Sequence, residues 1–303
     1  MLMPQVDRYL AIRCAAGFAL VPIEGYLRHF ARFATARGET SDVAITAIAW
    51  ATLAPSEAQR AYRLQTVIRF ARFMHAEDPR HEIPPVGVFR GRRPRPTPYI
   101  FSDEDIQQLL QYASRLGPPG SLRPHTYRTL FGLLGVTGMR VAEARNLLLQ
   151  DVTADGLLIR ETKFHKSRLL PLHATTRAAL ERYLAHRRRV AGTTAHLFVS
   201  RRHGKLSRTV VTQTFHQVLT AAGIPPQPGC RRPRLIDRRH TCAVRVLEAC
   251  PEPRDAVGRH TLALTTYMGH TCVANTYWYL ERTPQLMTDS ARTCEAFMYG
   301  GGS

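Results

Sequence analysis

Residues 135–147 read GVTGMRVAEARNL, a glycine-containing turn followed by an apolar helical pattern. Gly138 interrupts the preceding helical run, and Val141 and Leu147 then recur at helical spacing. Arg140 lies where the turn enters the helix, and its planar guanidinium could hold two oxygens of a phosphate at once. A solvent-exposed arginine after a helix-breaking glycine would give the same local pattern, so this segment alone leaves both interpretations open.

Three further segments of the chain contain basic, imidazole and phenol side chains at short sequence spacings. They read TKFHKSRLLPL at 162–172, PRLIDRRHT at 233–241 and YMGHTCVANTYWYLE at 267–281. The first includes a polar turn between short apolar runs at 157–160 and 169–172, which predict the two strands of a β-hairpin. Helical apolar spacing follows at 175–189, 207–222, 237–249 and 284–297. The sequence therefore predicts a mainly α-helical domain with a small antiparallel β-sheet over residues 99–303.

Residues 1–78 predict a separate helical domain. Aromatic residues recur there at helical spacing, and Ser56 begins a capping-box pattern that leads into a further apolar run. Residues 79–98 then lose this periodicity and gain prolines, as a linker between two domains would. Arg92, Arg93 and Arg95 lie in this linker, where they could contact a DNA backbone or only keep a spacer in solution.

Arginine dominates the charge of the chain. Lys plus Arg number 42 against 23 Asp plus Glu, which gives a net charge of +19 and a pI near 10.5. A polyanionic partner is expected, and double-stranded DNA is favoured over a membrane surface because the basic residues are spread along the whole chain. Only three residues are lysine, and Lys163 and Lys166 both lie in the predicted hairpin turn.

Cysteine usage and hydropathy limit the classes of protein to which this chain can belong. The six cysteines form no Cys-x-x-Cys pair and show no zinc-ligand spacing with the histidines, so we expect reduced thiols and no bound metal. The N-terminus has no basic leader before its apolar run, and no stretch reaches the roughly 18 apolar residues of a membrane span. These features predict a cytoplasmic protein with no membrane partner.

Taken together and in this order, the four segments resemble the motifs of the tyrosine recombinases of the phage integrase family. The histidine of the Gly-His pair lies nine residues before a tyrosine, as in that family. The resemblance covers residues 99–303, and the helical domain before the linker resembles the family's core-binding domain. It implies a site-specific DNA recombinase of a mobile element, of the integrase or transposase type, that cuts and rejoins double-stranded DNA through a 3′-phosphotyrosyl intermediate. It also implies that no cofactor takes part and that identical protomers form a tetrameric synapse, with the helix at 284–297 packing on a neighbour.

The resemblance assigns catalytic roles to Tyr279, Arg140, Arg239, Lys163 and His270. Tyr279 is the nucleophile, and Arg140 and Arg239 clamp the scissile phosphate. His270 donates a hydrogen bond to that phosphate. Lys163 protonates the departing 5′ oxygen, which suits a lysine because neighbouring cations and burial can lower its pKa, whereas a guanidinium stays charged.

Neighbouring residues have secondary roles. Glu143 matches an acidic position that in the family helps orient the first arginine. Lys166 and Arg168 are expected to contact DNA phosphates or to belong to the turn. Tyr277 competes with Tyr279 for the role of nucleophile. Residues two positions apart on a helix face different ways, so only one of the two can reach the phosphate, and the spacing from the histidine selects Tyr279.

The chain departs from the family's pattern at Ile236. The family usually has a histidine three residues before the second arginine, commonly in HDLRHT, and here the segment reads IDRRHT. Isoleucine cannot transfer a proton, so a DNA-binding family member with weak or lost catalysis is the alternative function. His240 lies one helical turn beyond Ile236 and is a candidate replacement for the missing histidine. A type IB topoisomerase would share the chemistry but usually lacks this two-domain plan.

Overall fold

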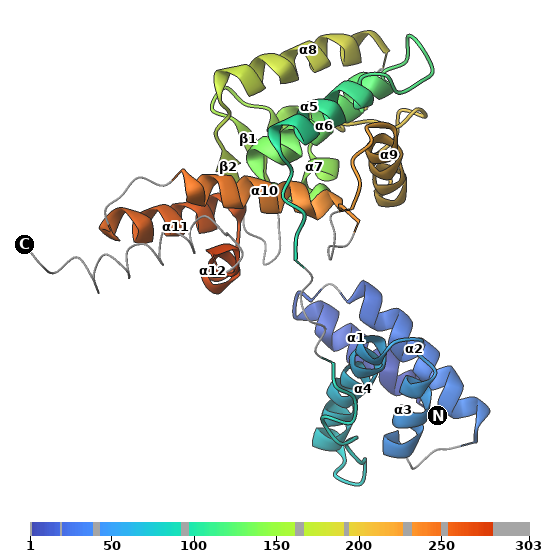
Figure 1. The fold of residues 1–303 in the computed structure, drawn as a ribbon. Helices are drawn as coiled ribbons and strands as arrows, with labels where there is room; N and C mark the ends of the chain where they lie inside the picture. The colour runs from blue at the N-terminus through green and yellow to red at the C-terminus, as the bar shows by residue number, and fades with distance from the viewer. Residues whose placement is uncertain are drawn as a thin grey trace, which may run out of the picture. The chain divides into compact units, whose positions relative to one another are not determined.

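The computed structural model describes residues 2–18, 20–38, 43–91, 97–160, 167–190, 194–226, 232–249 and 254–280. The chain divides into two compact units, Met1–Arg95 and Pro96–Ser303. Both are built mostly from α-helices (Figure 1). No helix within the described ranges is long and apolar enough to cross a membrane.

The described part of the first unit contains α1 (Met3–Ala15), α2 (Val21–Ala36), α3 (Val43–Thr52) and α4 (Glu57–Glu77). α4 begins where the sequence predicts, because the Ser56 side chain accepts a hydrogen bond from the backbone N–H of Gln59. Side chains from all four helices share one core, which includes Phe30, Trp50 and Phe70. The expected helical character of this region is confirmed.

The segment after α4 packs back on the first unit. Phe89 contacts the core, and the backbone N–H of Arg90 donates a hydrogen bond to the Glu57 carboxylate at 3.0 Å. The first unit therefore extends to residue 95, beyond the expected start of the linker at 79. One partly buried aromatic ring can anchor such a segment, because burying a phenylalanine fully contributes about 1.5–3 kcal/mol. Arg92, Arg93 and Arg95 lie outside the described residues.

The second unit combines several helices with one small sheet. Its elements are α5 (Asp103–Ala113), α6 (Arg123–Thr137), α7 (Val141–Asn146), a short 3₁₀ helix (Leu149–Asp151), β1 (Leu157–Ile159), β2 (Arg168–Leu170), α8 (Ala174–Val190), α9 (Arg208–Ala221), α10 (Leu235–Glu248), α11 (Arg254–Met268) and α12 (Ala274–Leu280). β1 and β2 pair antiparallel, with Leu157 opposite Leu170 and Ile159 opposite Arg168. A mainly helical fold with a small antiparallel sheet is thus confirmed.

The predicted helices at 175–189, 207–222 and 237–249 correspond to α8, α9 and α10. α11 was not predicted, because its apolar pattern is interrupted: Leu264 and Met268 are buried, but Leu262, two residues before Leu264, is exposed. The predicted helix at 284–297 lies outside the described residues.

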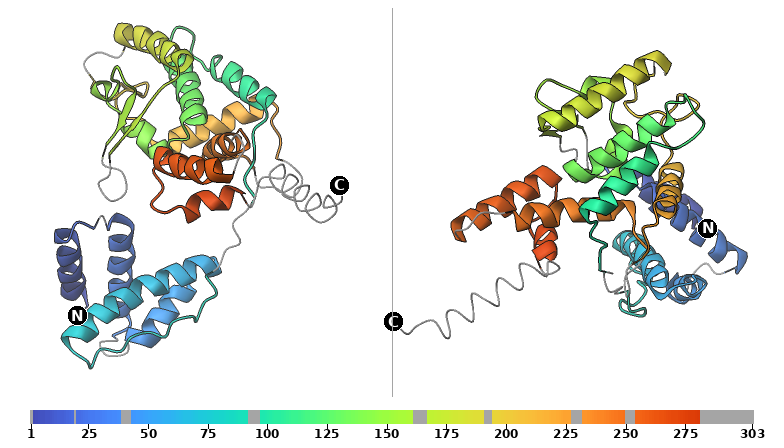
Figure 2. Two further views of the ribbon diagram at one scale, coloured as in Figure 1. Left: turned by 90° about the vertical axis from the view of Figure 1, so that its left-hand side faces the viewer. Right: turned by 45° about the horizontal axis from the view of Figure 1, so that its top comes forward.

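Two buried clusters hold the second unit together. α6 contributes Leu130, Phe131 and Leu134 to the larger cluster and packs against both α8 and α10 (Figure 1). The smaller cluster joins α10, α11 and α12, which lie together in both views of Figure 2. Met268 and Tyr279 belong to this smaller cluster.

Gly138 ends α6 in the left-handed conformation, with φ of 59°. A β-carbon at this position would lie 3.1 Å from the Met268 methyl and 3.3 Å from the Cys242 sulfur. Glycine therefore relieves the backbone strain and allows the turn to approach α10 and α11 closely. The chain then enters α7 with Arg140 as its N-terminal flanking residue.

Candidate active site

Arg140 and Arg168 both bind the carboxylate of Glu143. Arg140 donates from Nη1 to Oε1 at 2.8 Å and from its backbone N–H to Oε2 at 2.9 Å. Arg168 donates from Nη2 to Oε2 at 2.8 Å. The side chain of Arg168 is only 12% exposed, and that of Glu143 is 7% exposed. Burial raises the pKa of Glu143, but hydrogen bonds from Arg168 and Arg140 outweigh burial and lower it overall. Glu143 is therefore an anion that holds two cations in place.

The same two arginines also bind backbone carbonyls at the C-terminal end of α11 and directly after it. Arg140 Nη2 donates to the carbonyl of Gly269 at 2.9 Å, and Arg168 Nε donates to the carbonyl of Tyr267 at 2.9 Å. Gly269 has a φ of 65°, and a β-carbon there would lie 2.6 Å from Arg168 Nη1. The entry to α7, strand β2 and the end of α11 are thus fixed to one another at one point.

Arg239 reaches the same region from α10. Its guanidinium donates hydrogen bonds to the carbonyls of Gly138 and Met268, the latter at 2.8 Å. Burial, and then the charge of Arg140, lower the pKa of Arg239 to about 10. It remains a cation at neutral pH. Arg140 is close enough for its charge to act on Arg239, and the role of the two arginines as a phosphate clamp stays a prediction.

Tyr279 lies on α12 and is only 3% exposed. Its ring centroid lies 5.4 Å from that of His240 and 6.0 Å from that of His270, on which it stacks at 18°. Burial raises the pKa of the Tyr279 phenol, whereas the charge of Arg239, a hydrogen bond from Arg239 and the charge of Arg140 act in the opposite direction. The surroundings therefore favour the phenolate only through the two arginines.

His270 follows Gly269 and is half-buried. Its Nδ1 lies 2.8 Å from the hydroxyl oxygen of Thr276. Burial, and then the charges of Arg239, Arg140 and Arg168, lower the pKa of His270 to about 4. The ring is thus a neutral imidazole at physiological pH.

Ile236 lies in the first turn of α10, and 38% of its surface is exposed. His240 lies one turn later, with Nε2 3.9 Å from Oδ1 of Asp237. Burial lowers the pKa of His240 to about 4, although the charge of Asp237 opposes this. His240 adjoins the Tyr279 ring, and its role as a replacement for the missing histidine stays a prediction.

The structure brings together four of the five side chains predicted to be catalytic: Arg140, Arg239, His270 and Tyr279. Lys163 and Lys166 lie outside the described residues, as does the side chain of Tyr277. The expected phosphate contact of Arg168 stays a prediction, because its guanidinium faces Glu143 and the Tyr267 carbonyl.

Sequence reasoning missed the polar residues that support these side chains. Thr276 and Thr265 are buried behind His270, and their hydroxyl oxygens lie 2.8 Å apart. Thr276 precedes Tyr279 by one helical turn, but nothing in the sequence separates it from other buried threonines. Arg238 is also buried, at 2% exposure, with its guanidinium over the ring of Phe101.

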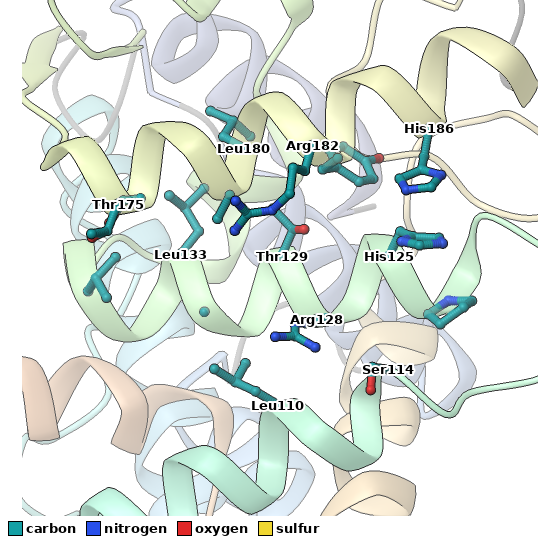
Figure 3. Close-up of a pocket in the computed structure, with 16 residues that line it drawn as sticks. Leu110, Ser114, His125, Arg128, Thr129, Leu133, Thr175, Leu180, Arg182 and His186 are labelled. Atoms are coloured by element: carbon teal, nitrogen blue, oxygen red, sulfur yellow. The ribbon is translucent and has the colours of Figure 1, made fainter.

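A pocket of about 510 Å³ lies elsewhere in the second unit, between α5, α6 and α8 (Figure 3). Leu110, Leu133 and Leu180 line it, and Arg128 and Arg182 also face it. None of the described residues of the predicted site borders this pocket. Within the described ranges, no group of three His, Cys, Asp or Glu side chains is placed to hold a metal ion.

Comparison with known proteins gives one consistent family. The profile of the phage integrase family matches residues 100–285. The y4rB protein of Sinorhizobium fredii, described as an integrase/recombinase, is 40% identical over 301 residues, which cover 96% of each chain. Tyrosine recombinase XerD of Caulobacter vibrioides is 30% identical over 233 residues, 75% of this chain and 71% of that protein.

Solved structures share the fold at lower identity. A lambda integrase dimer bound to a COC′ core site has a TM-score of 0.64 at 17% identity, covering 93% of this chain and 78% of that chain. The XerH recombinase in a post-cleavage complex with its difH substrate has a TM-score of 0.61 at 15% identity, covering 90% and 77%. A lambda integrase tetramer bound to a Holliday junction also has a TM-score of 0.61, at 18% identity, covering 89% and 77%.

Proposed function

The chain belongs to the phage integrase family of tyrosine recombinases, and we propose that its nucleophile is Tyr279. The observation that carries the proposal is that three side chains from separate segments converge around this phenol. The positive charge of Arg239 opposes the rise that burial causes in the pKa of the phenol, and the ring of His270 stacks on it. Arg140 binds the carbonyl of the residue before His270.

The protein is a site-specific DNA recombinase, and its reaction conserves the energy of the phosphodiester bond. The Tyr279 oxygen attacks the scissile phosphorus, a 3′-phosphotyrosyl bond forms, and the bond to the 5′ oxygen breaks. Lys163 supplies the proton that the departing 5′ oxygen takes up. The 5′ hydroxyl of a partner strand then attacks the phosphotyrosine and releases Tyr279.

Arg140 and Arg239 stabilise the charge that builds up on the phosphoryl oxygens in the transition state. Arg140 suits this role because 36% of its side chain is exposed, while Glu143 and the Gly269 carbonyl fix its orientation. Arg239 is buried, so its charge acts in a medium of low dielectric constant. Donors that are already oriented need no reorganisation during the reaction, which is how such clamps accelerate phosphoryl transfer.

Double-stranded DNA is the macromolecular partner of this activity. We propose that identical protomers assemble on it as a tetramer, which the lambda integrase tetramer on a Holliday junction supports as a precedent for the fold. A cytoplasmic location, and integration or excision of a mobile element as the biological event, are part of the same proposal.

The proposal is tested with a DNA substrate nicked beside the scissile phosphate, which traps the covalent adduct because the short 5′ fragment diffuses away. Tyr279→Phe should abolish the adduct on a denaturing gel, and Tyr277→Phe, the matched control, should retain it. Adduct formation by Tyr279→Phe would place the nucleophile elsewhere, with Tyr277 as the first candidate.

The alternative function is DNA binding with weak or lost catalysis, and the exposed Ile236 favours it because it offers no group for proton transfer. The same assay separates the two functions. If wild-type protein binds its site but gives no adduct, and Ile236→His gives none either, the protein is a DNA-binding member of the family.

A further inference from the structure

Buried hydroxyl groups form a hydrogen-bonded row behind His270. The hydroxyl of Thr265 donates to the carbonyl of Thr261 at 2.7 Å. The hydroxyl oxygens of Thr265 and Thr276 lie 2.8 Å apart, and that of Thr276 lies 2.8 Å from Nδ1 of His270. Thr261, Thr265 and Thr276 are 2%, 6% and 0% exposed.

The direction of each hydrogen bond in this row follows from counting protons. A carbonyl only accepts, so Thr265 must use its single hydroxyl proton on the carbonyl of Thr261. Thr265 then has only lone pairs to offer, so Thr276 donates its own single proton to Thr265. Toward His270, Thr276 can therefore only accept. Nδ1 of His270 consequently carries a proton and donates it to Thr276.

The charge of the ring decides the state of the other nitrogen. Arg239 lies on α10, Arg140 at the entry to α7 and Arg168 on β2, and their positive charges act on His270 together with His240. Burial and these neighbours lower the pKa of His270 to about 4, so the ring is neutral. In a neutral imidazole with a proton on Nδ1, Nε2 has a free lone pair and is a proton acceptor.

The phenol that must lose a proton adjoins this ring. The ring of Tyr279 stacks on His270 at a centroid distance of 6.0 Å. Arg239, and then Arg140, act on the Tyr279 phenol through their positive charges, which favour the loss of its proton. Ile236 cannot accept that proton, because its side chain has no lone pair.

We propose that Thr276 and Thr265 are positioning residues that keep Nε2 of His270 unprotonated, so that this nitrogen takes the phenolic proton of Tyr279 during cleavage. This inference rests on the proposed function. As the bond between Tyr279 and phosphorus forms, the proton moves to Nε2 and His270 becomes an imidazolium. Its new N–H then donates to a phosphoryl oxygen, and the proton returns to the tyrosine when the strand is rejoined. His270 thus accepts before it donates, which differs from the donor role expected from the sequence alone.

The test replaces the threonine hydroxyl without changing the volume of the side chain. Thr276→Val removes the acceptor of the Nδ1 proton, and Thr276→Ser, the matched control, restores a hydroxyl. Thr265→Val interrupts the row one step earlier, which allows Thr276 to turn its proton toward Nδ1. We expect both valine variants to cleave the nicked substrate about 10²-fold more slowly, the lower end of what a general base contributes, and the serine variant to remain near wild type.

A direct readout of the tautomer separates this role from general damage to the fold. In full-length protein with nitrogen-15 histidine, two-bond nitrogen–proton spectra distinguish protonated from bare ring nitrogens, and comparison with His270→Asn assigns the signals. Wild type and Thr276→Ser should have the proton on Nδ1 of His270, and the valine variants should shift it to Nε2. An Nε2 proton in wild type, or an unchanged cleavage rate in both valine variants, would overturn the inference. Neither result would affect the adduct test on Tyr279→Phe, so failure of the proposed function remains separately detectable.

Discussion

Replacing Arg168 by glutamine separates two roles for this residue. The sequence suggests a contact with a DNA phosphate, whereas the structure directs the guanidinium at the Glu143 carboxylate and the Tyr267 carbonyl. Arg188→Gln is the matched control, because Arg188 lies exposed near the end of α8 and carries the same charge.

The expected loss of stability follows from the burial of the ion pair. Removing one partner of a buried pair costs about 3–5 kcal/mol, because the other charge is left without compensation. Glu143 keeps two hydrogen bonds from Arg140, so we expect the lower end, about 3 kcal/mol. At about 2–4 °C per kcal/mol for a unit of this size, the melting temperature should fall by about 6–12 °C.

The effect should also depend on pH. The pKa of Glu143 is lowered in the folded state, so the stability that its carboxylate contributes is present above the unfolded pKa and is lost as pH falls through the folded pKa. The stability difference between wild type and Arg168→Gln should therefore shrink in acid. Thermal unfolding at several pH values measures this difference.

DNA affinity gives the opposing test. A residue that neutralises one phosphate contributes about 0.9 to the slope of log affinity against log salt concentration. We expect Arg168→Gln to leave this slope unchanged while cleavage slows. Unchanged stability together with a slope smaller by about 0.9 would refute the positioning role and support the phosphate contact.

Three further predictions follow from single features of the chain. Gly135→Ala should destabilise the protein by about 1–3 kcal/mol, because a β-carbon there would lie 2.0 Å from the buried guanidinium of Arg238. Gly132→Ala should not destabilise it, because a β-carbon at residue 132 would have no neighbour closer than 3.8 Å. Denaturant titration measures both variants, and equal unfolding midpoints would contradict the clash. Ile236→His should raise the cleavage rate about tenfold. This is below the 10²- to 10⁴-fold range of a sole general base, because the new imidazole would act in addition to His270. Slower single-turnover cleavage by this variant would show that the new imidazole is not positioned to assist. Wild-type affinity for duplex DNA should fall steeply between low and physiological salt, and a flat titration would contradict phosphate neutralisation by this arginine-rich chain.

Features that depend on nearby residues could be predicted from the sequence. The hairpin follows from two apolar runs around a polar turn, and the α4 terminus follows from Ser56 and the residue three positions later. The turn at Gly138 is equally local, since only a left-handed residue ends α6 there without strain. Helix α11 could not be predicted, because its buried face is defined by α10 and α12 rather than by a continuous apolar pattern.

The sequence by itself determined the family, the order of the motifs and the identity of the nucleophile as a prediction, because these depend on residue types at fixed spacings. Only the tertiary structure decided the partners of those residues. Glu143 meets Arg168 from another segment, and Arg239 meets carbonyls at Gly138 and Met268. The proton position on His270 is also a tertiary property, because it depends on hydroxyl groups of two different helices. Spacing along the chain defines which face a side chain occupies, but the group that lies across from it is defined by packing.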